Sequence, residues 1–150
     1  MYHAIVFIHV LSAIVAVGSN ATYAVWFARG SLERDHLLFA LRGIKFIDDR
    51  LANPAYGVLL ITGIAQVIIS GRSWHQAWIE WAVALYIILA LLAFAVYTPV
   101  LKQQIRVLSQ GGPDDPTFLS GERKRTAVGI ALFVLALAIV ALMVFRPGGF

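Results

Sequence analysis

Four apolar blocks separated by short polar segments dominate this sequence and constrain its fold more than any motif does. A helix needs about 20 mostly apolar residues to cross a hydrocarbon core of about 30 Å. The chain is 60% hydrophobic and 13% charged, whereas about a quarter of the residues in a globular domain are charged. The sequence therefore predicts an all-α integral membrane protein that forms a four-helix bundle in lipid.

We expect a single domain over residues 1–150, with spans at residues 2–27, 53–69, 77–101 and 126–145. No Lys or Arg precedes the first apolar run, and no clear small-residue cleavage site follows it. The first block is therefore expected to be a retained helix rather than a signal peptide. Cysteine is absent, which excludes disulfides and thiolate metal sites.

The distribution of Lys and Arg predicts the orientation of the helices. Ten basic residues fall in the first and third polar segments, whereas the middle loop holds only Arg72 and the C-terminal tail only Arg146. Cytoplasmic loops carry the excess of Lys and Arg, so both long segments are expected in the cytoplasm and both termini outside. Aromatic residues mark the same edges, the outer one with Tyr2, Trp74, Trp78 and Trp81 and the inner one with Trp26, Tyr56 and Tyr97.

The first cytoplasmic segment is predicted to form an amphipathic helix in the membrane interface. Residues 31–49 are mixed in charge, but apolar residues recur at helical spacing at Leu37, Leu38, Leu41 and Ile44. Asn53 and Pro54 are a typical N-cap and first-turn pair, so this helix is expected to end near Ala52 and a new one to begin.

The first spanning helix carries a stripe of small and polar residues on one face. At steps of three and four from His9 lie Ser12, Ala13, Ala16, Ser19, Asn20 and Tyr23. The opposite face suits lipid, so the His9 side is expected to pack into the bundle. A weaker polar line on the second helix includes Gln66, and the third adds Glu80 near its outer end. The fourth has almost no hydrogen-bonding side chain and is predicted to be a lipid-facing wall.

These polar residues define a candidate cofactor site in the outer leaflet, formed by His9, Ser12, Gln66 and Glu80. An ionisable group within a spanning helix costs about 2.5 to 3.5 kcal/mol on insertion scales, which makes it a functional candidate. The structural alternative stays open, because Ser and Gln commonly bond between helices and Glu80 lies close to interfacial water. His9 is either a metal ligand or an interhelical donor.

Charged residues at the inner edge are assigned structural roles. Asp48, Asp49 and Arg50 are expected to form surface or interhelix ion pairs rather than a catalytic carboxylate pair. No nucleophile and base pair occurs at usable spacing, and no catalytic residue is predicted. The net charge of +4 lies at membrane edges, so nucleic acid is not an expected partner.

Several short motifs resemble a family of uncharacterised four-helix bacterial integral membrane proteins. They are the stretch from Phe7 to Leu11, Asp49-Arg50 followed by Pro54, Gly57 and Gly63, the Trp-rich start of the third helix, and Pro99-Val100-Leu101. That family is distantly similar to a group of copper-resistance proteins and membrane protoporphyrinogen oxidases. The resemblance implies a multi-pass protein of the inner membrane, with haem b or a metal on His9.

A six-coordinate haem would need a second axial ligand facing His9, and the other three spanning helices contain no His. Two functions are therefore weighed: a haem- or metal-binding protein in redox or cofactor handling, and a non-catalytic accessory subunit that packs against a larger complex. The second would use the small-residue stripe for docking, as would a homo-oligomer. A transporter is less well supported, because broken helices and repeated halves are missing.

Overall fold

The computed structural model describes residues 1–32 and 34–147, with the side chains of Arg34 and Asp35 also outside the described part. The Arg34 side chain, which counts toward the predicted orientation, and residues 148–150, which end the predicted domain, thus lie outside the described part of the chain. The helices are α1 (Tyr2–Leu32), α2 (Arg34–Ile47), α3 (Asn53–Ser70), α4 (Ala77–Leu92), α5 (Thr98–Gln110) and α6 (Pro116–Phe145). The π-helical turn η1 (Asp48–Ala52) joins α2 to α3, and η2 (Ala93–Tyr97) joins α4 to α5.

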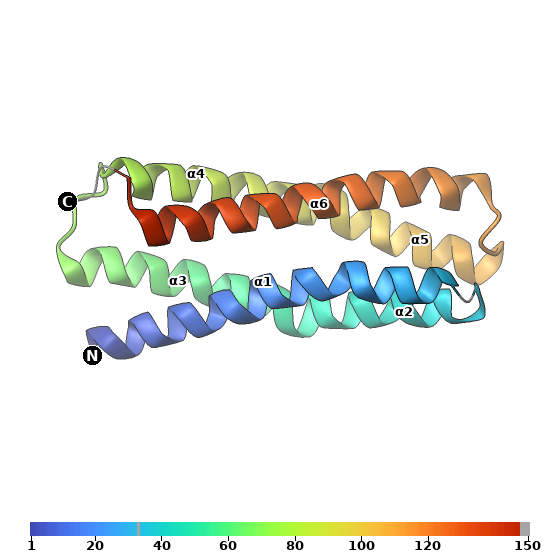
Figure 1. Ribbon diagram of the computed structural model, residues 1–150, viewed down its shortest axis with the longest axis horizontal. Helices are drawn as coiled ribbons and strands as arrows, with labels where there is room; N and C mark the ends of the chain where they lie inside the picture. Colours follow the sequence, from blue (N-terminus) through green and yellow to red (C-terminus); the bar gives the residue numbers. More distant parts are fainter. Residues whose placement is uncertain (33, 148–150) are drawn as a thin grey trace.

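Figure 1 shows four antiparallel rods: α1, α2–η1–α3, α4–η2–α5 and α6. Both termini and the α3–α4 turn lie at one end, and the α1–α2 and α5–α6 turns lie at the other. Helix α1 packs along α2 and α3, and α6 packs along α4 and α5. The two hairpins meet where α1 contacts α6 and α2 contacts α5. All four rods are long and apolar enough to cross a membrane, which confirms the predicted all-α four-span architecture.

The rods are longer than the hydrocarbon layer. They contain 31, 35, 34 and 30 residues. At a rise of 1.5 Å per residue they measure about 45 to 52 Å, against about 30 Å of hydrocarbon. The excess lies at the end that holds α2, α5 and the start of α6, which is also where ten of the twelve Lys and Arg residues fall. The bundle therefore has an apolar outer part and a polar extension of about 15 to 20 Å.

The predicted boundary near Ala52 coincides with the junction of η1 and α3, but the helix of the first polar segment is not separate from the second span, because helical backbone continues from α2 through η1 into α3. Ala52 and Asn53 both have right-handed helical backbone angles, and Asn53 caps nothing with its side chain. The Asn53 N–H instead bonds the Asp48 carbonyl, five residues back. A wide π-turn admits Pro54, whose ring would otherwise collide with a carbonyl four residues earlier. The same arrangement precedes Pro99, where the Thr98 N–H bonds the Ala93 carbonyl.

The apolar face of α2 is buried against protein rather than lipid. Leu37, Leu41 and Ile44 are almost fully buried and share a core with Leu101 of α5 and Phe118 of α6. The helical spacing of these apolar residues is thus confirmed, but they form the core of the polar extension rather than a lipid-facing surface. The hydrophobic effect accounts for this choice, because the extension needs its own core where lipid no longer covers the helices.

The outer part of the bundle exposes its large apolar side chains, as a lipid-facing surface does. Phe7 and Ile14 on α1 expose 68% and 64% of their surface, and Trp81 at the start of α4 exposes 64%. On the other face of α1, Ala16, Ser19 and Tyr23 are buried. The predicted division of α1 into a lipid face and a bundle face is therefore confirmed.

Candidate functional site

His9 points from α1 onto α3. Its Nδ1 lies 2.9 Å from Thr62 Oγ1, and the Thr62 hydroxyl lies 2.6 Å from the Val58 carbonyl oxygen. His9 and Thr62 thus share an interhelical hydrogen bond whose direction depends on the tautomer of the imidazole. The ring packs against Gly63, where an added Cβ would stand 3.2 Å from His9 Cε1. His9 is therefore a half-buried residue that joins α1 to α3.

Among the described residues, no hydrogen bond joins His9 to the other predicted site residues Ser12, Gln66 and Glu80. Gln66 lies one turn beyond Thr62 on α3, and its Nε2 is buried with no partner among the described residues. Glu80 exposes 58% of its side chain and pairs with His75 Nδ1 at 3.2 Å. Ser12 is half-buried on α1. In the described part of the chain, no group of three or more His, Asp or Glu side chains is placed to hold a metal ion.

A cavity of about 540 Å³ lies between the two hairpins, at the level of the π-turns. We call it the central cavity, and its lining residues come from α1, α2, η1, α3, α4, η2 and α6. Its polar lining residues are Asn20, Tyr23, Asp48, Asn53, Tyr56, Tyr97, Glu122, Arg125 and Thr126. Phe27, Ile44, Leu89, Leu132 and Phe133 are among the apolar ones. π-Turns occur frequently at functional sites, and here η1 supplies Asp48 and η2 supplies Tyr97.

Asp48 is the centre of a buried hydrogen-bond group on the α1–α3 side of the cavity. Its exposed fraction is 7%, and its carboxyl oxygens accept from Tyr23 Oη at 3.2 Å and from Asn53 Nδ2 at 3.5 Å. The Tyr23 ring stacks with that of Tyr97 at a centroid distance of 6.3 Å. The predicted surface or interhelix ion pair is therefore wrong for Asp48, whose two partners are neutral, and right for Asp49, which pairs with Lys45 at the surface.

A second polar group continues toward the end of the bundle that holds both termini (Figure 1). Asn20 Nδ2 donates to Tyr56 Oη at 2.6 Å, and Tyr86 Oη donates to the Tyr56 carbonyl at 2.8 Å. These bonds join α1, α3 and α4 across the bundle. Tyr56 and Tyr97, which are predicted at the inner membrane edge, both line the central cavity inside the bundle.

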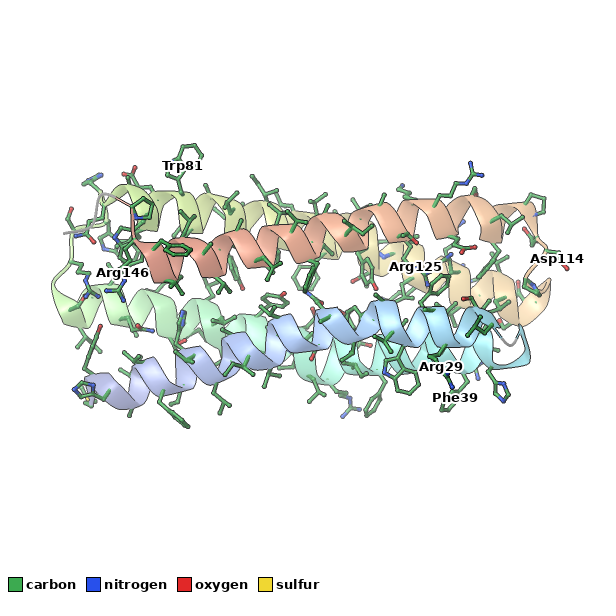
Figure 2. All side chains as sticks on the ribbon, viewed as in Figure 1. Arg29, Phe39, Trp81, Asp114, Arg125 and Arg146 are labelled. Carbon is green, nitrogen blue, oxygen red and sulfur yellow. The ribbon has the colours of Figure 1, made fainter. Side chains whose placement is uncertain are left out.

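Arg125 of α6 is the buried cation of the central cavity. Its exposed fraction is 4%, and its guanidinium lies 3.6 Å from the centroid of the Phe27 ring. Figure 2 places Arg125 between α6 and α1, whereas Trp81 points away from the bundle. Its Nη1 has no hydrogen-bond partner among the described residues. Helix α6 is thus a wall of the central cavity as well as a lipid-facing surface, which corrects the sequence prediction.

Four polar residues of the central cavity share one depth. Tyr23, Asp48, Tyr97 and Arg125 each lie about 20 to 22 residues from the outer end of their rod, which corresponds to about 30 to 33 Å. That distance matches the thickness of the hydrocarbon layer. The central cavity therefore lies where the apolar part of the bundle meets its polar extension.

Several features of the sequence mark residues of this site, although their local patterns predict other roles. Tyr23 and Asn20 are the inner end of the α1 stripe, and Pro54 and Pro99 each follow a π-turn after one intervening residue. Its place in a run of basic residues predicts that Arg125 lies in a cytoplasmic segment. Nothing in a sequence alone distinguishes it from its neighbours Arg123 and Lys124, both of which are exposed.

The profile of a family described as "Predicted integral membrane protein (DUF2269)" matches residues 3–147. The chain belongs to this family. The matched region of this DUF2269 protein contains all four rods except Tyr2, and every residue that lines the central cavity. Neither a curated protein nor a solved structure shows significant similarity to the chain.

Proposed function

We propose that this membrane protein binds a small amphipathic molecule in the central cavity. The polar head of the ligand bonds Arg125 at the inner edge of the hydrocarbon, and its apolar part lies among side chains of α1, α4 and α6. The volume of about 540 Å³ falls within the range of about 300 to 1,000 Å³ of small-molecule sites. Like those sites, this one combines apolar walls with a few placed polar groups.

The unpartnered Nη1 of Arg125 is the observation that carries this proposal. A buried N–H of a charged group that has no acceptor is destabilising, because it loses hydration without gaining a hydrogen bond. The face of the Phe27 ring compensates part of that loss. A ligand oxygen that accepts from Nη1 supplies the missing bond, and so the geometry favours a bound state.

Removal of the Arg125 charge is expected to release the ligand. We expect a molecule extracted in organic solvent from wild-type protein, purified under mild conditions, to be depleted at least about tenfold in Arg125→Met, because a hydrogen bond to a charged group is lost. Mass spectrometry of the extract measures this. Lys124→Met, next to it and exposed, is the matched control and should retain the ligand. Equal ligand content in wild type and Arg125→Met contradicts the proposal.

Haem b on His9 is the function implied by the resemblance to the copper-resistance and protoporphyrinogen oxidase group. Nε2 of His9 is chemically suited to iron, but the donor set does not fit a six-coordinate haem. The helical rods of the described structure offer no second His in the bundle interior, since His36 is exposed, and Gly63 occupies one side of the His9 ring.

The absorption spectrum of the purified protein tests the haem hypothesis. From the donor set we expect no Soret band in the wild type. We also expect His9→Ala to cost about 0.5 to 1.5 kcal/mol in unfolding free energy, because the bond to Thr62 is lost. A Soret band in the wild type that disappears in His9→Ala would contradict this expectation and identify His9 as the ligand.

We also propose an orientation and a location for this protein, and we name partners as an alternative. Ten basic residues at the polar end support a cytoplasmic position of the extension, and the family resemblance supports a bacterial inner membrane. A role as accessory subunit or homo-oligomer is the alternative to ligand binding by a single chain. Gentle extraction followed by mass measurement tests it, since a lone monomer would count against it.

A further inference from the structure

We propose that the ligand of the central cavity is a single-chain amphiphile with a carboxylate head group. This inference rests on the proposed function and adds the chemical class of the ligand. The carboxylate accepts from Arg125 Nη1 and from the hydroxyl of Tyr97, and the chain runs from there toward the outer leaflet.

Two donors without acceptors face the central cavity. Arg125 Nη1 has no partner in the described chain, and the Tyr97 hydroxyl donates to no described group. The Tyr97 ring lies against α6 at Gly129, where an added Cβ would stand 3.6 Å from Tyr97 Cε2. Gly129 is one turn from Arg125 on the same face of α6, so the hydroxyl and the guanidinium share that wall. A carboxylate has two acceptor oxygens, one for each donor.

The charges of the lining favour one negative charge on the ligand. Asp48, Glu122 and Arg125 are the charged residues of the central cavity. Asp48 already accepts from Tyr23 and Asn53, and Glu122 is half-exposed on the solvent side of Arg125, where water screens it. A monoanion pairs with Arg125, whereas the second charge of a phosphate monoester would be repelled by the two carboxylates.

The apolar lining continues from Arg125 into the hydrocarbon layer. Leu132 and Phe133 lie seven and eight residues beyond Arg125 on α6, about 10 to 12 Å closer to the outer end. Leu89 of α4 and Ala93 of η2 line the central cavity on the same hairpin as these two residues. An acyl chain that follows these side chains buries its methylenes, each of which contributes about 0.8 kcal/mol on leaving water. The cavity thus has the polarity of a fatty acid, with its polar end at the membrane edge.

Binding of three 14-carbon compounds to the full-length, delipidated protein tests the head group. Tetradecanoate, tetradecanol and tetradecyl phosphate share a chain and differ only in the head. Equilibrium dialysis with labelled compounds in non-ionic detergent measures each affinity. We expect tetradecanoate to bind at least about tenfold more tightly than the other two. Arg125→Gln should lose this preference but keep tetradecanol binding, whereas Lys124→Gln should behave as the wild type does.

The outcomes separate this inference from the proposed function. Equal binding of tetradecanoate and tetradecanol by the wild type overturns the carboxylate and leaves an amphiphile site in place. Tighter binding of tetradecyl phosphate also overturns it, in favour of a phosphate head. Binding of none of the three, together with an empty organic extract, overturns the proposed function itself. Circular dichroism of each variant establishes that it is folded.

Discussion

Replacement of Gly30 by alanine is expected to destabilise the α1–α2 hairpin by about 1 to 3 kcal/mol, because the new methyl group overpacks a closed interface. A Cβ at Gly30 would stand 2.5 Å from Ala40 Cβ and 3.4 Å from Leu37 Cα. The first distance is far inside van der Waals contact, and backbone and a short side chain cannot rotate away. The helices must separate, which loosens the core around Leu41.

The measurement is equilibrium unfolding in mixed micelles, followed by far-ultraviolet circular dichroism. Gly18→Ala on the same helix is the matched control, since no atom lies within 4 Å of a Cβ there. Alanine is a better helix former than glycine by about 0.8 to 1.0 kcal/mol, so Gly18→Ala should leave stability unchanged or raise it slightly. Equal effects of the two substitutions would show that Gly30 is not a point of close approach.

Substitution of Asp48 by leucine is expected to have an effect of similar or greater size. The carboxyl group accepts from Tyr23 and Asn53 inside the bundle, and leucine leaves both donors without an acceptor. Each buried donor left unpaired costs about 1 to 3 kcal/mol. Asp48→Asn retains one acceptor oxygen and should lie between the wild type and Asp48→Leu. The unfolding assay used for Gly30 measures the three proteins side by side.

Two further variants make the Asp48 result specific. Asp49→Asn removes a surface pair with Lys45 and should change stability by less than about 0.5 kcal/mol. Tyr23→Phe removes one of the two donors to Asp48. Its effect and that of Asp48→Leu should therefore sum to more than the effect of the double variant. Strict additivity would mean that the 3.2 Å contact between Tyr23 and Asp48 contributes nothing to stability.

The sequence was sufficient to predict the helices and the lipid-facing surface. Lipid imposes a minimum length on each apolar block, and the stripe through Ala16, Ser19 and Tyr23 follows helical spacing, so both patterns are local. The burial of these residues in α1 follows directly. An interhelical hydrogen bond was also one of the two roles predicted for His9, and the structure shows one with Thr62.

The central cavity could not be predicted, because its parts become neighbours only when the two hairpins meet. Asp48 and Arg125 lie 77 positions apart, each within a run of charged residues that a linear pattern assigns to the membrane surface. Their neighbours Asp49 and Lys124 are in fact exposed. One charge in each run faces inward, and this selection depends on the rotation of each helix about its axis.

The π-turns set that rotation. A π-turn contains one residue more than an α-helical turn. The helix that follows is therefore rotated about its axis by about 100° relative to an uninterrupted helix. The buried faces of α2 and α5 in the polar extension are consequently rotated about the helix axis relative to the buried faces of α3 and α4 in the apolar part of the bundle. Deleting a single residue from η1 would restore a regular helix and rotate one half of the rod away from its partners. Each of the two rods that contain a π-turn can thereby bury one face within the hydrocarbon layer and a different face beyond the edge of the membrane.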